Sequence, residues 1–141
     1  MPTFHPKTPK KCPPKSATSP DGIYFRIVIN DPPIPKNFVI WVEEPYNNQR
    51  LRTMTRQGDC RVFAVSMFST EAATLRKLNL FRQAWEKRKI LYGDGFLGIA
   101  KVKLDLTSGK IKQTSQDTAH YSLWPYVNSR LERNVISVKG A

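Results

Sequence analysis

Residues 92–106 read YGDGFLGIAKVKLDL, a glycine-rich turn followed by a run in which apolar and charged residues alternate. Alternation with a period of two places successive side chains on opposite faces of a β-strand. One face carries Phe96, Gly98, Ala100, Val102, Leu104 and Leu106. The other face carries Leu97, Ile99, Lys101, Lys103 and Asp105. The stretch therefore predicts a tight turn and an edge or semi-exposed strand, with one apolar and one basic face.

The segments on either side predict further strands. Upstream, β-branched and aromatic residues dominate IYFRIVIN (23–30), NFVIWVEE (37–44), RLRTMTR (50–56) and CRVFAVSMF (60–68), and the turn-forming DPPIP, PYNNQ and QGD separate them. The segment CRVFAVSMF (60–68) has apolar residues on both faces, which is typical of a central, covered strand. Downstream, a polar linker, KIKQTSQDTA, leads to two short closing strands in HYSLWPYV and ERNVISVKG. Short connections favour an antiparallel sheet.

A helix interrupts this pattern in STEAATLRKLNLFRQAWEKRK, residues 69–89. The spacing of Leu75, Leu78, Phe81 and Trp85 is that of one helical face, and Ser69 or Thr70 is placed to cap the first turn. We expect an amphipathic helix around residues 70–89 that packs across the sheet, with the apolar stripe in the core.

The length of 141 residues allows one domain with a core. Residues 1–20 contain six prolines, four lysines and no acidic residue, a composition with almost nothing to bury. This predicts a disordered basic arm, followed by a single β-rich binding domain over residues 21–141. The arm lysines, which would contact polyanions, dock into a partner, signal nuclear import or merely aid solubility, are Lys7, Lys10, Lys11 and Lys15.

The chain carries 23 Lys and Arg against 11 Asp and Glu, a net charge of +12. Such an excess attracts phosphate-bearing partners, of which nucleic acid and an anionic membrane surface are the main candidates. Seven cations of the domain cluster in sequence and predict a polyanion site if they share a face, namely Lys87, Arg88, Lys89, Lys101, Lys103, Lys110 and Lys112. The alternative is an ordinary solvated surface.

The cysteines and the N-terminus bear on location. Cys12 lies in the predicted arm and Cys60 in the domain, so we expect no disulfide, two inert thiols and a reducing compartment. The sequence shows neither an apolar run of roughly 18 residues nor the apolar region of a secretory signal. The expected location is intracellular, in the cytoplasm with peripheral attachment to membranes, and the nucleus is left open.

The segment GDGFLGIAKVKLDL resembles the late-strand signature of C2 domains, in which an acidic turn precedes an F-L-G triplet and an alternating strand that ends in leucine. The resemblance extends loosely to the opening strand IYFRIVIN and to YSLWPYVNSRLERNVISVKG at the end, about half of the chain. It implies an antiparallel β-sandwich of eight strands that docks on phospholipids or proteins through loops at one end.

The calcium site of C2 domains is not matched. Asp94 corresponds to the aspartate ahead of the triplet, but RQAWEKRKILYG supplies Lys and Arg in place of the other aspartates. The segment EEPYNNQ matches the family's D-P-Y turn only at Pro45 and Tyr46. Because calcium requires six to eight oxygen ligands, the resemblance implies a calcium-independent module, and we expect neither a metal nor a cofactor.

The predicted helix would be an insertion in a C2 sandwich, so an α+β fold of one antiparallel sheet plus a helix is the alternative. Single-strand nucleic-acid binders are also built this way. Their stacking residues would be Tyr24, Phe25, Trp41 and Phe63, unless these pack in the core. Their phosphate contacts would be Arg26, Arg50, Arg52, Arg56 and Arg61. A self-associating viral matrix or capsid protein has the same build.

Enzymatic function finds little support. His5 lies in the arm and His120 in the polar linker, with no Cys, Asp or Glu at metal-ligand spacing. Ser122 and Asp117 flank His120, but near neighbours in a linker do not form a catalytic triad. The sequence therefore predicts a non-enzymatic module for a polyanionic surface, first an anionic phospholipid or a protein partner, with nucleic-acid binding or a viral structural role as the alternative.

Overall fold

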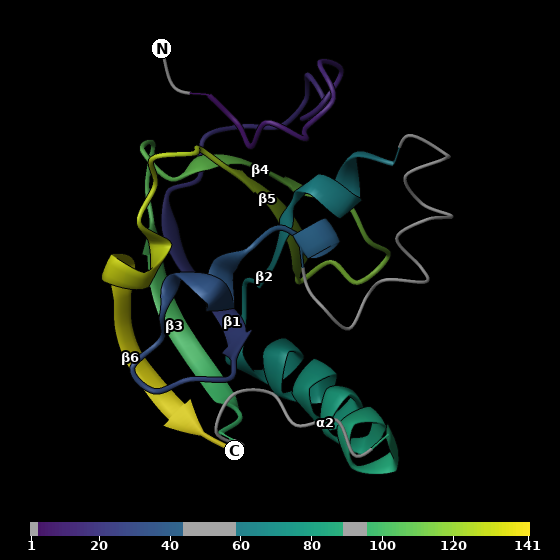
Figure 1. Cartoon of the computed structure of the whole chain (residues 1–141), viewed down its shortest axis with the longest axis vertical. Coiled ribbons are helices and arrows are strands. Elements are labelled where there is room, and N and C mark those ends of the chain that lie inside the picture. The colour runs from purple at the N-terminus through teal and green to yellow at the C-terminus, as the bar shows by residue number, and fades with distance from the viewer. Residues whose placement is uncertain (1–2, 44–58, 89–95) are drawn as a thin grey trace.

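The computed structural model describes residues 3–43, 59–88 and 96–141, and for residues 84–88 it describes the backbone alone. The described strands form one antiparallel six-stranded sheet in the order β4-β5-β2-β1-β3-β6. The chain is mainly β, with one antiparallel sheet and the helix α2 (Figure 1). The strands are β1 (Gly22–Val28), β2 (Val65–Phe68), β3 (Gly98–Leu104), β4 (Gly109–Gln113), β5 (His120–Pro125) and β6 (Val135–Gly140). The helix α2 spans Glu71–Arg88, and the 3-10 turns are η1 (Pro35–Phe38), η2 (Trp41–Glu43), η4 (Cys60–Phe63) and η5 (Leu131–Asn134).

The predicted strands around β1, β3, β5 and β6 are confirmed, and the alternation in β3 is as expected. Ala100, Val102 and Leu104 are buried, whereas Lys101 and Lys103 are exposed. β3 is not an edge strand, because it pairs with β1 on one side and with β6 on the other. It is semi-exposed through one face only.

The strand predicted over residues 37–44 is wrong in its described part, where η1 and η2 form instead. The side chain of Asn37 is the local reason. Its Oδ1 accepts hydrogen bonds from the backbone N–H of Ile29 at 2.7 Å and of Asn30 at 3.2 Å. An Asn side chain that binds backbone groups in this way competes with strand pairing. The strand predicted over residues 50–56 lies outside the described residues.

The segment 60–68 begins as a turn and ends as a strand. Asp59 caps η4 by accepting from the backbone N–H of Arg61 at 3.0 Å, and β2 starts only at Val65. β2 lies between β5 and β1, so the expected central position is confirmed. The cap explains the shorter strand, because it satisfies backbone donors in a turn conformation.

Residues 110–119, expected to be a polar linker, begin with an edge strand instead. In β4 Ile111 is buried, while Lys110 and Lys112 on either side of it are half-buried. A solvated edge strand needs only one inward side chain here, so its sequence is nearly as polar as a loop. The prediction of a linker is therefore wrong for residues 110–113.

The sheet is curled rather than flat. Three strands separate β3 from β4, which in a flat sheet corresponds to roughly 19 Å at about 4.8 Å per spacing. Their connection is a turn in which Ser108 N donates to Asp105 O at 3.0 Å, and such a turn spans less than about 7 Å. The curl also brings Thr18, just before β1, against β4, where it exchanges two backbone hydrogen bonds with Ile111 at 2.9 and 2.7 Å. This strand order does not confirm a C2-like sandwich.

Helix α2 lies against β1, β2 and β3. Thr70 is its cap, because Thr70 Oγ1 accepts from Ala73 N at 3.1 Å. Leu78 is fully buried, but Leu75, assigned to the same face by its spacing, is 45% exposed. The described part of the helix therefore buries a narrower stripe than expected.

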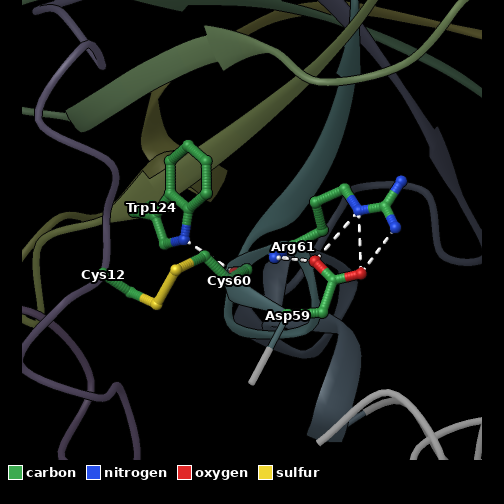
Figure 2. Close-up of a disulfide and its surroundings, with 5 residues drawn as sticks. All are labelled: Cys12, Asp59, Cys60, Arg61 and Trp124. Atoms are coloured by element: carbon green, nitrogen blue, oxygen red, sulfur yellow. Dashed lines mark hydrogen bonds and ion pairs between the residues drawn. A yellow bond between two sulfur atoms is a disulfide. The ribbon is translucent and has the colours of Figure 1, made fainter. Parts of the chain in front are cut away.

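The N-terminal arm is not a free segment in the structure. Cys12 forms a disulfide with Cys60, with 5.5 Å between their Cα atoms (Figure 2). Phe4 and Thr18 form β-bridges with Tyr126 and Ile111. The expectation of unpaired cysteines is therefore wrong, and the argument for a reducing compartment loses its basis. The disulfide and the two β-bridges hold the arm in place, although its sequence has no apolar periodicity.

The disulfide lies against the core. Trp124, which is fully buried, donates its indole N–H to Cys60 O at 2.9 Å, as Figure 2 shows. On the other side of Cys60, Arg61 holds the carboxylate of Asp59 and thereby keeps the pKa of Asp59 below its ordinary value, chiefly by a side-chain hydrogen bond. In the part of the chain described, no helix is both long and apolar enough to cross a bilayer.

Candidate polyanion-binding face

The strand register places lysines from three strands on the same side of the sheet. Lys101 of β3 lies opposite Phe25 of β1, and Phe25 lies opposite Phe68 of β2. Phe68 in turn lies opposite His120 of β5. Residues two apart on a strand share a face. The face that carries Lys101, Phe25, Phe68 and His120 also supports α2 and is called the outer face below.

β4 and β6 extend the same face at the two ends of the sheet. Lys112 lies opposite Ser122, which is on the His120 side of β5, and Lys139 lies opposite Ile99, which is on the Lys101 side of β3. The basic part of the outer face, called the lysine face, consists of Lys101, Lys103, Lys110, Lys112 and Lys139. Lys139 was not among the sequence candidates, because its place on this face depends on the pairing of β6 with β3.

The curl of the sheet brings the lysines of β3 and β4 to the same short segment. Lys103 Nζ lies 3.3 Å from Asp21 Oδ1, and Lys110 Nζ donates to Ser19 Oγ at 3.1 Å. Residues 19–21 therefore run between the two lysines. Asp21 is almost fully exposed, so its pairing with Lys103 is weak and leaves that ammonium accessible.

A shallow hollow of about 280 Å³ borders the lysine face. Its lining includes Phe25, Glu71 at the start of α2, Lys101 and Lys139. The mixture of one acidic and two basic residues does not select for a small anion. We therefore regard the hollow as the border of a broad charged surface.

The other predicted cations belong to the arm or lie outside the described residues. Lys89 and the side chains of Lys87 and Arg88 fall outside the described residues. In the arm, Lys7 Nζ is 3.8 Å from Glu43 Oε1, and Lys10, Lys11 and Lys15 are exposed. Of the predicted seven-residue cluster, the side chains that the structure describes are those of Lys101, Lys103, Lys110 and Lys112, and strand register assigns all four to the outer face.

Most of the aromatic side chains predicted to stack on nucleic-acid bases are buried or packed against other residues. Phe63 is buried, and the ring of Tyr24 packs edge-on against Tyr121 with 5.6 Å between centroids. Burial, with a smaller contribution from Tyr121, raises the pKa of Tyr24. Trp41 is half-buried in η2, and Phe25 lines the hollow.

The arginine candidates for phosphate contacts follow the same trend. Arg26 is buried and donates to Asn37 O and to Ser66 O, both at 2.9 Å. Arg61 binds the carboxylate of Asp59. Arg50, Arg52 and Arg56 lie outside the described residues. The two described candidates, Arg26 and Arg61, thus each bind a partner within the fold.

His120 begins β5 and contacts a serine that the sequence did not suggest. Its Nε2 lies 3.1 Å from Ser66 Oγ, and its ring packs on Phe68 with 5.1 Å between centroids. Ser122, the neighbour considered from the sequence, pairs with Thr114 instead, at 2.6 Å between hydroxyl oxygens. Burial, and then the charge of Lys77 on α2, lower the pKa of His120. The expectation that the chain is not an enzyme stays a prediction.

Possible metal ligands are scattered over the same described residues. Within them, no three His, Cys, Asp or Glu side chains lie close enough together to hold a metal ion. Asp94, the aspartate that matches the C2 calcium site, is outside that set. Comparisons with protein-family models, with curated proteins and with solved structures find no match.

Proposed function

We propose that this protein attaches reversibly to anionic phospholipid surfaces through its lysine face, as a calcium-independent binding module. The observation that carries the proposal is the convergence of Lys103 and Lys110, from strands distant in the sheet, on residues 19–21. Together with Lys101, Lys112 and Lys139 they give one side of the sheet a cationic surface. The resemblance of residues 93–106 to C2 domains points to the same class of partner.

The expected strength follows from the charges. A lysine close to an anionic bilayer contributes about 1 kcal/mol before desolvation and mutual repulsion. Five lysines, offset in part by Asp21, suffice for attachment that salt weakens, because exposed charges are screened beyond a Debye length of about 8 Å at physiological salt. The net charge of +12 further attracts the chain to such surfaces.

The exposed side chains favour a lipid surface over a single nucleic-acid strand as the partner. Non-specific binding of single strands relies on exposed aromatic rings on which bases stack. Here Phe63 is buried and Tyr24 packs against Tyr121, while the accessible groups of the face are ammonium groups. Lipid phosphates need only such cations.

The test is a paired titration of the full chain with phosphatidylserine-containing vesicles and with a single-stranded oligonucleotide at one salt concentration. The Lys101→Glu/Lys103→Glu variant should bind vesicles at least about thirtyfold more weakly, since two lysines contribute about 2 kcal/mol. The matched control, Lys10→Glu/Lys11→Glu, changes the net charge equally but in the arm, and should lose much less.

Charge variants are preferable to deletion of the arm. Removing residues 1–20 would also remove Cys12 and the Thr18 pairing with β4, and so would disturb the fold as well as the charge. Equal losses in the two double variants would contradict a localised lysine face. Tighter binding of the oligonucleotide, with a steep salt dependence, would contradict the choice of phospholipid.

A further inference from the structure

The turn between β3 and β4 presents an apolar side chain to solvent. This turn covers residues 105–108. In it Leu106, which strand alternation assigned to the apolar face, is 72% exposed. An isolated exposed leucine is common on protein surfaces. Its surroundings set this one apart, because the turn is fixed in place, a second exposed apolar residue lies nearby, and lysines flank it.

The turn is fixed by its own hydrogen bonds. Asp105 Oδ1 accepts from Thr107 N at 2.8 Å and from Thr107 Oγ1 at 2.5 Å, and these bonds lower the pKa of Asp105. Asp105 N donates to the hydroxyl of the buried Ser108 at 3.1 Å. Gly109 continues into β4 with φ +149°, where a Cβ would collide with the backbone of Trp124. Leu106 is therefore held outward by a rigid frame.

A second apolar residue lies at the same end of the sheet. Tyr126 N donates to Ser108 O at 3.1 Å, which places the chain after β5 beside the turn (Figure 1). The next residue, Val127, is 50% exposed and is itself fixed by a bond from its N–H to Thr3 O at 2.7 Å. Leu106 and Val127 are called the apolar tip below.

Lysines lie on both sides of the turn in the chain. Lys103 precedes it on β3 and Lys110 follows it on β4, and their ammonium groups contact residues 19–21 as described above. Apolar side chains that enter the boundary between headgroups and acyl chains, with cations at the level of the phosphates, are typical of proteins that bind at a membrane interface. Charge complementarity thus favours an anionic bilayer as the occupant.

We infer that the apolar tip inserts into an anionic phospholipid bilayer while Lys103 and Lys110 contact its phosphates. This inference rests on the proposed function and adds the depth and orientation of binding. The tip follows β3, whereas the resemblance to C2 domains implies an acidic docking loop before that strand. The end of the molecule that faces the membrane is therefore the one that the resemblance did not indicate.

The experiment measures the affinity of the full chain for vesicles of phosphatidylserine with phosphatidylcholine and of phosphatidylcholine alone. Leu106→Ser/Val127→Ser should bind the anionic vesicles about tenfold more weakly, the loss expected when roughly one apolar side chain is no longer buried. The matched control is Leu80→Ser, a 60% exposed leucine on α2, which should bind like the natural chain. In a Leu106→Trp variant, brominated lipid should quench more fluorescence than in the natural chain.

The outcomes separate the two proposals. If the tip variant binds as the natural chain does, and Lys101→Glu/Lys103→Glu still weakens binding, the insertion is overturned and the lysine face stands. An equal loss in Leu80→Ser also overturns the insertion. If the natural chain does not bind anionic vesicles, both proposals fail. A loss confined to the tip variant, with added quenching in the Leu106→Trp variant, supports insertion.

Discussion

The N-terminal arm and helix α2 both lie on the sheet, but they are attached in different ways. The helix has a regular backbone and buries Ala73 and Leu78. The arm holds no helix or named strand among residues 3–20 and is attached by the Cys12–Cys60 disulfide and two β-bridges. Burial with a helical period can be recognised within a short stretch of sequence. A bond between residues 48 positions apart cannot be recognised locally.

The largest effect is expected where the helix depends on side-chain burial. Leu78→Ala should lower the free energy of unfolding by about 2–5 kcal/mol, because it removes apolar contacts and leaves a cavity. Chemical denaturation measures the change. Leu75→Ala, on the same helix at a 45% exposed position, is the control and should cost much less. Equal losses would mean that packing does not attach the helix.

The disulfide should have the next largest effect, and it should act on the arm first. Cys12→Ser/Cys60→Ser should lower the free energy of unfolding by about 2–4 kcal/mol, since the bond restricts the unfolded chain. Limited trypsin digestion should then cut sooner after Lys10, Lys11 and Lys15 than in the natural chain. An unchanged rate of cleavage in the arm would show that the two β-bridges hold it without the bond.

The difference between these two attachments also explains which predictions succeeded. The strand at Gly98–Leu104 and the helix were predicted, because alternation and helical spacing report burial directly. The strand expected over residues 37–44 failed at Asn37, whose side chain binds backbone groups of Ile29 and Asn30. Such a contact depends on where the chain returns in the fold. The strand propensity of single residues carries no information about that.

The candidate site shows the same limit. Lys101 and Lys103 were predicted to share a face, as they do, because both lie on one strand. Their relation to Lys110 depends on the curl of the sheet, and the contribution of Lys139 depends on the pairing of β6 with β3. Leu106 was assigned to the apolar face by alternation, but the strand ends at Leu104 and the turn directs it to solvent.

A smaller effect should come from the start of the helix. Thr70→Ala should lower the free energy of unfolding by about 1 kcal/mol, because Ala73 N loses the hydroxyl that it contacts. Thermal or chemical unfolding measures this change. Ser69→Ala is the control, as Ser69 contributes only a backbone N–H to Ala119 O among the hydrogen bonds described. A larger loss for Ser69→Ala would assign the cap to the wrong residue.

The smallest effect is expected from one proton on His120, which lies near Lys77 of α2. Its pKa in the folded state is lowered, first by burial and then by Lys77. The unfolded chain therefore binds a proton more readily than the folded protein. Stability is complete above the ordinary His pKa of about 6.5 and declines as the pH falls below it. Denaturation midpoints at about pH 7.5 and 5.5, on either side of that value, measure this slope, which His120→Gln should reduce.

Two further variants connect this slope to the helix rather than to the arm. His5→Gln removes the histidine of the arm, which contacts Glu43 at 2.7 Å, and leaves His120 in place, so the slope that His120 causes should persist. Lys77→Gln removes the charge that adds to burial, so protonation of His120 becomes less unfavourable and the slope should decrease. If Lys77→Gln left the slope unchanged while His120→Gln removed it, burial alone would lower the pKa of His120, and the charge on the helix would not contribute.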